Sequence, residues 1–136
     1  LKLVKFINDL NLSNYVIFLG HKEGNEKLSI LSHSKLLVLP SHTENFGNVI
    51  IEAYSSFLPC ICSANTPWKI LEKLKIGYCY KGDYIDLYKK MIELLNWNSE
   101  KYFQICEKGK QFITENYSIK SKDTQIKKFL RQIDQN

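Results

Sequence analysis

The sequence predicts an α/β protein, with a Rossmann-like parallel sheet of about four short strands flanked by helices and followed by a C-terminal helical tail. Two observations support this fold class. Up to residue 82, short apolar runs alternate with segments whose apolar residues recur at helical spacing. After residue 83 the pattern is helical only. Strands that alternate with helices form parallel sheets with right-handed crossovers. We expect the helical tail to cover an edge of this sheet or to reach a neighbouring domain.

The expected elements follow in chain order. Helical spacing of apolar residues predicts an amphipathic helix over residues 1–11, and an apolar run predicts a buried strand over residues 15–19. A Gly/His/Lys loop over residues 20–25 then leads to a short helix that ends near His33. The later elements are strands 36–39, 60–63 and 78–80, a helix over 47–57, a helix start at 65–68 capped by Asn65 or Thr66, and three helical stripes between residues 84 and 133.

The composition is that of one globular domain, residues 1–136. Of these residues 44% are hydrophobic, and no run approaches the ~20 apolar residues needed to span a bilayer. The chain begins at Leu1 and its only methionine is Met91, so we expect it to be part of a longer protein. The spacing of the four cysteines is not that of a metal or redox motif and predicts buried thiols at Cys60, Cys62, Cys79 and Cys106.

The net charge of +5 is unevenly distributed along the chain. Residues 1–68 contain five lysines and five acids, whereas residues 69–136 contain fourteen Lys/Arg and nine acids. Two interpretations remain open: solvated helix faces, or weak attraction of the basic half to an anionic membrane surface or an acidic polymer. Eighteen of the nineteen cations are lysine, whereas specific base readout tends to use arginine, so we expect no nucleic-acid partner.

The central stretch, residues 40–53, leads from an apolar strand through a polar loop into a helix. The first N–H groups of a helix lack partners and its dipole favours negative charge, so such a corner binds anions. Glu44 and Glu52 bracket this corner, and acids repel a bare phosphate. A ligand with both phosphate and hydroxyl groups suits both features, because carboxylates accept hydrogen bonds from sugar hydroxyls. The combination predicts a sugar-nucleotide site.

Four motifs, in order, resemble those of the retaining glycosyltransferases of group 1, also called family 4. They are V-x-F-x-G at residues 16–20, E-x7-E from Glu44 to Glu52, a P-V-I-like strand at residues 59–62, and T-P-W at residues 66–68 with Gly77-Tyr78. The resemblance covers nearly the whole chain and implies the C-terminal, donor-binding domain of a two-domain GT-B enzyme. In one departure, Phe57 and Leu58 stand where the family usually has a small residue and glycine.

The resemblance also implies roles for individual residues. Glu44 would be the catalytic residue, in contact with the donor sugar, and Glu52 would accept hydrogen bonds from both ribose hydroxyls. The donor sugar and phosphates would lie against Asn45, Phe46, Gly47, Asn48 and Val49, with His42 beside them, and the base against Gly20, His21 and Lys22. We expect no cofactor and no metal ligand set.

Each assignment has a structural alternative. The acids could complement a helix dipole or sit exposed on a helix, residues 45–49 could form an ordinary helix start, and the histidines could be exposed loop residues. The aromatic side chains of Trp68, Tyr78 and Tyr80 could line an acceptor site or pack in the core.

The favoured hypothesis is the donor-binding half of a retaining hexosyltransferase in the cytoplasm. It would use a nucleoside-diphosphate sugar in polysaccharide or glycolipid synthesis. Its partner would be the N-terminal domain of the same protein, and the resemblance places the phosphate-neutralising Arg and Lys upstream of Leu1. The 136-residue chain alone would then bind nucleotide weakly and transfer no sugar. The alternative is a non-catalytic nucleotide-binding or interaction module; a dinucleotide-binding domain is disfavoured because the sequence has no G-x-G-x-x-G.

Overall fold

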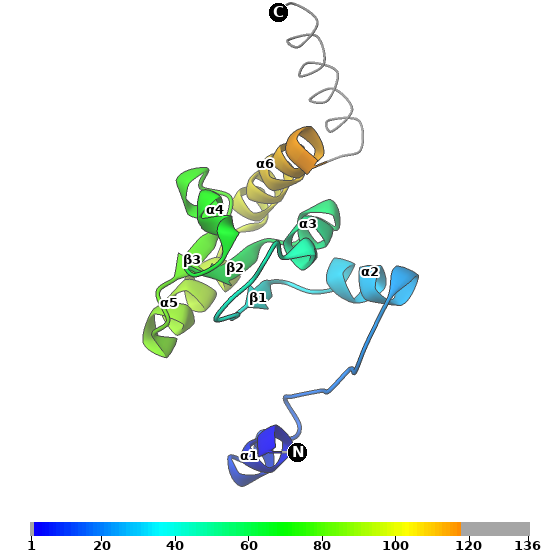
Figure 1. Ribbon diagram of the computed structural model, residues 1–136, viewed down its shortest axis with the longest axis vertical. Coiled ribbons are helices and arrows are strands. Elements are labelled where there is room, and N and C mark those ends of the chain that lie inside the picture. The colour runs from blue at the N-terminus through cyan, green and yellow to red at the C-terminus, as the bar shows by residue number, and fades with distance from the viewer. Residues whose placement is uncertain (1, 118–136) are drawn as a thin grey trace, which may run out of the picture.

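The computed structural model describes residues 2–117, and at its centre lies a parallel sheet of three strands (Figure 1). The strands are β1 (Leu37–Leu39), β2 (Cys60–Ser63) and β3 (Tyr78–Tyr80), in the order β1-β2-β3. At the centre of the sheet, Cys62 lies opposite Leu39 on one side and Cys79 on the other. The α/β fold class with a parallel sheet is therefore confirmed.

Helices make up most of the remaining secondary structure. They are α1 (Lys2–Asp9), α2 (Gly24–Ser32), α3 (Asn48–Ser55), α4 (Ile70–Lys73), α5 (Tyr84–Leu95) and α6 (Ser99–Tyr117), with a 3₁₀-helix, η1 (Pro67–Lys69), directly before α4. In Figure 1, α5 lies beside β3, away from α3. Thr66 caps η1 as one of the two predicted cap residues, because its hydroxyl accepts the backbone N–H of Trp68 at 3.4 Å.

The core has two parts because β2 is buried on both faces. Cys60 and Cys62 pack into a cluster on the side of α3 and α4, whereas Ile61 packs with Tyr80 and Leu94 on the side of α5. This alternation is the two-residue period of a strand, and burial on both faces explains the continuous apolar run in the sequence. All four cysteines are free and buried, as predicted.

The strand predicted at residues 15–19 does not form. Tyr15 and Ile17 are 82% and 80% exposed, and no described strand pairs with this segment, which links α1 to α2 as an extended connection (Figure 1). An apolar composition indicates a segment suited to burial, but a strand also needs a neighbour for its backbone N–H and C=O groups. The sheet therefore has three strands within the described residues rather than about four.

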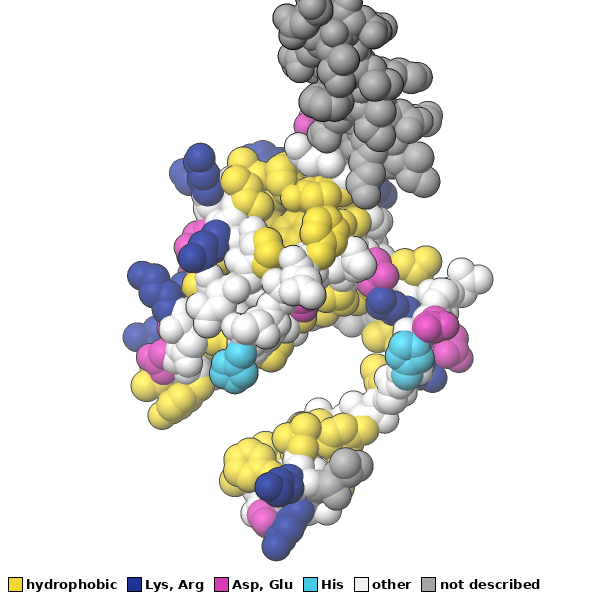
Figure 2. Space-filling view, in the orientation of Figure 1, with side chains coloured by type: hydrophobic (Ala, Val, Ile, Leu, Met, Phe, Trp, Pro, Cys, Tyr) yellow, Lys and Arg dark blue, Asp and Glu magenta, His cyan; other side chains and the backbone are white. Residues whose placement is uncertain are grey.

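The predicted N-terminal amphipathic helix does form, as α1. It stands apart from the sheet in Figure 1, and Figure 2 shows hydrophobic side chains on its surface. Leu3 and Phe6 are each more than half exposed, whereas Ile7 is buried.

Two further predictions need a correction or a limit. α2 begins at Gly24, within the predicted loop over residues 20–25, with Glu23 in an extended conformation before it. The last helical stripe, residues 119–133, lies outside the described residues. Among residues 2–117, no helix combines the length and apolar character needed to cross a membrane.

One buried side chain, Tyr54 on α3, joins three elements. Its hydroxyl donates to the carbonyl of Ile76 at 2.6 Å, just before β3. A Cβ atom at Gly77 would lie 2.7 Å from that hydroxyl, and one at Gly109 on α6 would lie 2.2 Å from the ring. Burial, as the main cause, raises the pKa of Tyr54 well above its ordinary value, so the hydroxyl stays a proton donor. Two glycines thus make room for one aromatic ring.

We predict that Gly109→Ala destabilises the protein, although alanine is the better helix former. The added methyl group would overlap the ring of Tyr54, and such overpacking lowers the free energy of unfolding by about 1–3 kcal/mol. Urea denaturation followed by circular dichroism measures the change. The matched control is Glu107→Ala on the exposed side of the same helix, expected within about 0.5 kcal/mol of the wild type. A Gly109→Ala variant as stable as the wild type would contradict the packing of α6 on Tyr54.

Candidate functional site

The loop between β1 and α3 ends at Gly47, which precedes α3 in a left-handed conformation with φ of 72°. The space beside it is filled as well: a Cβ atom would lie 2.8 Å from Nε1 of Trp68 and 3.3 Å from Cγ of Glu44. Glycine alone adopts this φ without strain and fits this space. The sequence requirement at position 47 is therefore both conformational and steric.

Trp68 on η1 holds the loop between β1 and α3 in place. Its indole Nε1–H donates to the carbonyl of Phe46 at 2.5 Å, and the two rings meet edge to face at 6.1 Å. Tyr117, at the end of α6, packs against both rings, with centroids 5.7 Å from Phe46 and 5.4 Å from Trp68. The loop that leads into α3 is thus held by an aromatic cluster from two other elements.

Two of the three aromatic residues named as candidates for an acceptor site pack in the core instead. Trp68 is 2% exposed and Tyr80 is 8% exposed, so core packing is confirmed for both. Tyr78 is half-buried; its hydroxyl donates to Glu93 and its ring packs against Trp97 at 5.8 Å.

Hydrophobic side chains also gather on the outside of this region, over α4 and the end of α6 (Figure 2). Phe46 is 43% exposed and Leu74, directly after α4, is 40% exposed.

Glu44 contacts its own loop. Its Oε1 accepts the backbone N–H of Gly47 at 3.1 Å. This contact is compatible with the structural alternative for Glu44, an acid that complements the dipole of α3. Within residues 2–117, no protein group accepts the N–H groups of Asn48 and Val49. The start of α3 therefore keeps two free donors and the positive end of the helix dipole for an anion. Asn45 is exposed on the same loop.

Glu52 lies further along α3 and faces α2. Its Oε2 is 2.5 Å from Nζ of Lys27, and each of the two side chains is 34% exposed. Around this ion pair lies a cleft of about 370 Å³ between the two helices, lined also by Glu23, Gly24 and Leu28. The structure thus places the predicted ribose-binding acid in a concave site.

The predicted base-flanking segment directly precedes Glu23 of this cleft in the chain; it consists of Gly20, His21 and Lys22. Nε2 of His21 lies 2.8 Å from Oε1 of Glu23, and Nζ of Lys22 lies 3.4 Å from Glu26. His42 is exposed on the other loop. The two acids of the central motif make separate contacts, Glu44 within its loop and Glu52 with α2.

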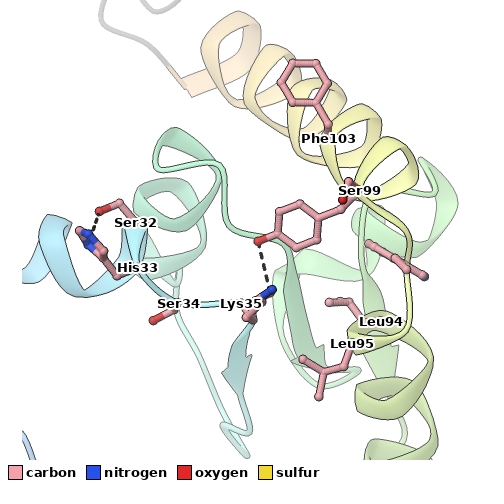
Figure 3. Close-up of a pocket in the computed structure, with 10 residues that line it drawn as sticks. Ser32, His33, Ser34, Lys35, Leu94, Leu95, Ser99 and Phe103 are labelled. Atoms are coloured by element: carbon pink, nitrogen blue, oxygen red, sulfur yellow. Dashed lines mark hydrogen bonds between the residues drawn. The ribbon is translucent and has the colours of Figure 1, made fainter.

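Another cavity, of about 440 Å³, opens at the opposite end of β1 (Figure 3). It is lined by residues 32–35, before the strand, and by side chains of α5, α6 and their junction. The hydroxyl of Tyr102 donates to the carbonyl of Lys35 at 3.3 Å, and burial, as the main cause, raises the pKa of Tyr102 to about 12. Ligands of parallel α/β sheets usually lie at the carboxyl ends of the strands, where the loop with Glu44 lies, so this cavity is not part of the candidate site.

The family follows from the sequence as a whole. Residues 1–112 match the model of the family described as glycosyl transferases group 1. The chain belongs to this family. An uncharacterized glycosyltransferase of Methanocaldococcus jannaschii is 33% identical to it over 115 residues, which cover 82% of this chain and 32% of that relative. This chain therefore spans about a third of the length of the relative.

Solved glycosyltransferase structures share the fold. Sucrose-phosphate synthase from Thermosynechococcus elongatus has a TM-score of 0.83 and 21% identity, with 97% of this chain and 33% of that chain covered. HepE of Anabaena, solved in complex with UDP and glucose, has a TM-score of 0.76 and 19% identity, with 96% and 36% covered. This chain thus shares the Rossmann-like α/β architecture of GT-B enzymes, as the resemblance implied.

Sequence reasoning missed two features of this site. Lys27 and Glu52 lie on different helices, so no spacing rule connects them. The hydrogen bond from Trp68 to Phe46 joins residues 22 positions apart, and only the T-P-W motif drew attention to that tryptophan.

We predict that Gly47→Ala is more destabilising than Gly82→Ala. Both glycines have positive φ, 72° and 86°, but a Cβ atom at Gly82 meets nothing within 4 Å. Gly82→Ala should therefore cost only the left-handed strain, about 1–2 kcal/mol. Gly47→Ala should cost a further ~1–3 kcal/mol, because the Trp68 indole has to move. Chemical denaturation of both variants measures the difference, and equal losses would contradict the steric role of Trp68.

Proposed function

We propose that this chain is the donor-binding half of a retaining hexosyltransferase. The donor is a nucleoside-diphosphate sugar, and the acceptor is a glycan or lipid-linked sugar in polysaccharide or glycolipid synthesis. The observation that supports the proposal best is the position of Glu52 in a cleft. The lining of this cleft begins at Glu23, directly after the predicted base-flanking segment, residues 20–22. Sugar transfer belongs to the longer protein, whose N-terminal domain supplies the acceptor site and lies opposite this domain.

The nucleoside is assigned to the cleft between α2 and α3. Carboxylate oxygens are suitable acceptors for the two ribose hydroxyls, and Glu52 is the residue that α3 contributes to this cleft. We assign the base to the segment of Gly20, His21 and Lys22, which directly precedes Glu23 of the cleft in the chain. The cleft volume of about 370 Å³ is within the range of small-molecule sites.

The diphosphate is assigned to the start of α3. The free N–H groups of Asn48 and Val49 lie at the positive end of the helix dipole. The nucleoside diphosphate is the leaving group of the reaction, so negative charge develops on its phosphates in the transition state. Donors that are already oriented stabilise this charge without reorganisation.

The donor sugar is assigned to the loop that carries His42, Glu44, Asn45 and Phe46. Oε1 of Glu44 is bonded to the Gly47 amide, while its Oε2 makes no hydrogen bond within the described residues. Oε2 can therefore contact the sugar while Oε1 keeps the loop in place. We assign Glu44 the catalytic role of stabilising positive charge at the reacting sugar carbon.

We place the enzyme in the cytoplasm, where its four free, buried cysteines would stay reduced. Peripheral contact of its basic half with an anionic membrane would bring it close to a lipid-linked acceptor.

We predict that the chain binds UDP or GDP in isothermal titration calorimetry, and that Glu52→Ala weakens this binding by ~1–3 kcal/mol through the loss of a charge-assisted hydrogen bond to ribose. The control is Glu72→Ala, which removes another ion-paired glutamate, 3.8 Å from Lys90 and outside the cleft. Unchanged affinity in Glu52→Ala would contradict the ribose assignment. A wild-type chain that binds neither nucleotide would contradict the donor site itself.

A further inference from the structure

We propose that Lys27 is a positioning residue for Glu52, and that it thereby sets the preference of the cleft for ribose over deoxyribose. The inference rests on the proposed function, because it assumes that the cleft binds a nucleotide. It adds to the site a residue of α2 that lies outside every motif of the sequence analysis.

The contact between the two side chains fixes one carboxylate oxygen. Oε2 of Glu52 is 2.5 Å from Nζ of Lys27 and is shielded from solvent. No hydrogen bond to Oε2 is formed within the described residues, so the stabilising interaction is the ion pair itself. An ionised oxygen that is removed from water without a partner is strongly unfavourable. Lys27 therefore makes this orientation of Glu52 possible.

The orientation leaves the second oxygen for a ligand. Oε1 of Glu52 forms no hydrogen bond within residues 2–117, and a carboxylate oxygen has two lone pairs, one for each ribose hydroxyl. Because Lys27 is on α2 and Glu52 on α3, the pair also joins the two helices that line the cleft. A carboxylate held at one oxygen presents the other in a single direction.

Neighbouring charges do not replace Lys27 in this role. Lys22 is paired with Glu26, and His21 with Glu23. The side chains of His21 and Glu23 are more than 80% exposed, so water and salt screen their attraction. The Lys27–Glu52 pair is two-thirds shielded, which strengthens the attraction and restricts both side chains.

Two roles of Lys27 give different binding patterns. If Lys27 only holds α2 against α3, its loss weakens the binding of every nucleotide by the same factor. If Lys27 orients Glu52, its loss weakens the ribonucleotide more than the 2′-deoxy form, because the ribonucleotide loses hydrogen bonds from both hydroxyls and the deoxy form loses only the one from its 3′-hydroxyl. The ratio of affinities for ribo- and 2′-deoxyribonucleotide therefore separates positioning from general structural support.

The experiment measures this ratio by calorimetry on the 136-residue chain, with UDP, GDP and their 2′-deoxy forms. We expect the wild type to bind the ribonucleotide about tenfold more tightly than its deoxy form. Lys27→Met should bring the ratio close to one, whereas Lys27→Arg, which keeps the cation, should preserve it. The matched control is Lys90→Met, which removes an ion-paired lysine 3.1 Å from Asp86 and should leave the ratio unchanged.

The outcomes distinguish the role of Lys27 from the proposed function, nucleotide binding in the cleft. A ribose preference that Glu52→Ala abolishes but Lys27→Met retains would overturn the role of Lys27 and leave the proposed function intact. Absence of nucleotide binding by the wild type would overturn the proposed function, and this inference with it. Circular dichroism checks the folding of each variant. Should Lys27→Met fail to fold, Lys27→Gln gives the same comparison, and an unchanged ratio in that variant also rejects the inference.

Discussion

The candidate site depends on one partly buried hydrogen bond, from the indole of Trp68 to the carbonyl of Phe46. A buried indole N–H needs an acceptor, and here the acceptor is the backbone of the loop that starts α3. The bond leaves no space for a side chain at Gly47, and Glu44 closes the other side of that glycine. The T-P-W segment, with Thr66 as its cap, therefore acts on the site through the backbone geometry of the loop.

Near this fixed loop the charges are divided between the start of α3 and the side of α3 that faces α2. The start of the helix offers amide donors and is suited to anionic groups, whereas its side facing α2 offers a paired carboxylate and is suited to hydroxyl groups. Glu44 stays close to the helix start because it accepts the Gly47 amide, which offsets the repulsion between an acid and a bound anion. Glu52 is compensated by Lys27. An acid-containing anion site is physically reasonable because each acid already has its own donor or cation.

Features that depend on local chain chemistry could be predicted from the sequence. The strands at residues 60–63 and 78–80 have the predicted bounds because both are short apolar runs between turn residues. The start of η1 follows from Thr66 and Pro67. Features that depend on distant partners could not be predicted: residues 15–19 have strand-like composition without a pairing strand. The pairing of Lys27 with Glu52 is likewise fixed only by how two helices pack.

The packing of Tyr54 has a consequence for how this family can vary. Its ring occupies the space that a side chain at position 109 would need, on a helix far from α3 in the chain. Position 77 is restricted by the backbone as well, because a Cβ atom there would lie 2.6 Å from the carbonyl oxygen of Cys60. Positions 54 and 109 are therefore not independent in evolution. A homologue with a small residue in place of the tyrosine is free to carry a larger residue at position 109, and the two exchanges should appear together in an alignment as correlated changes.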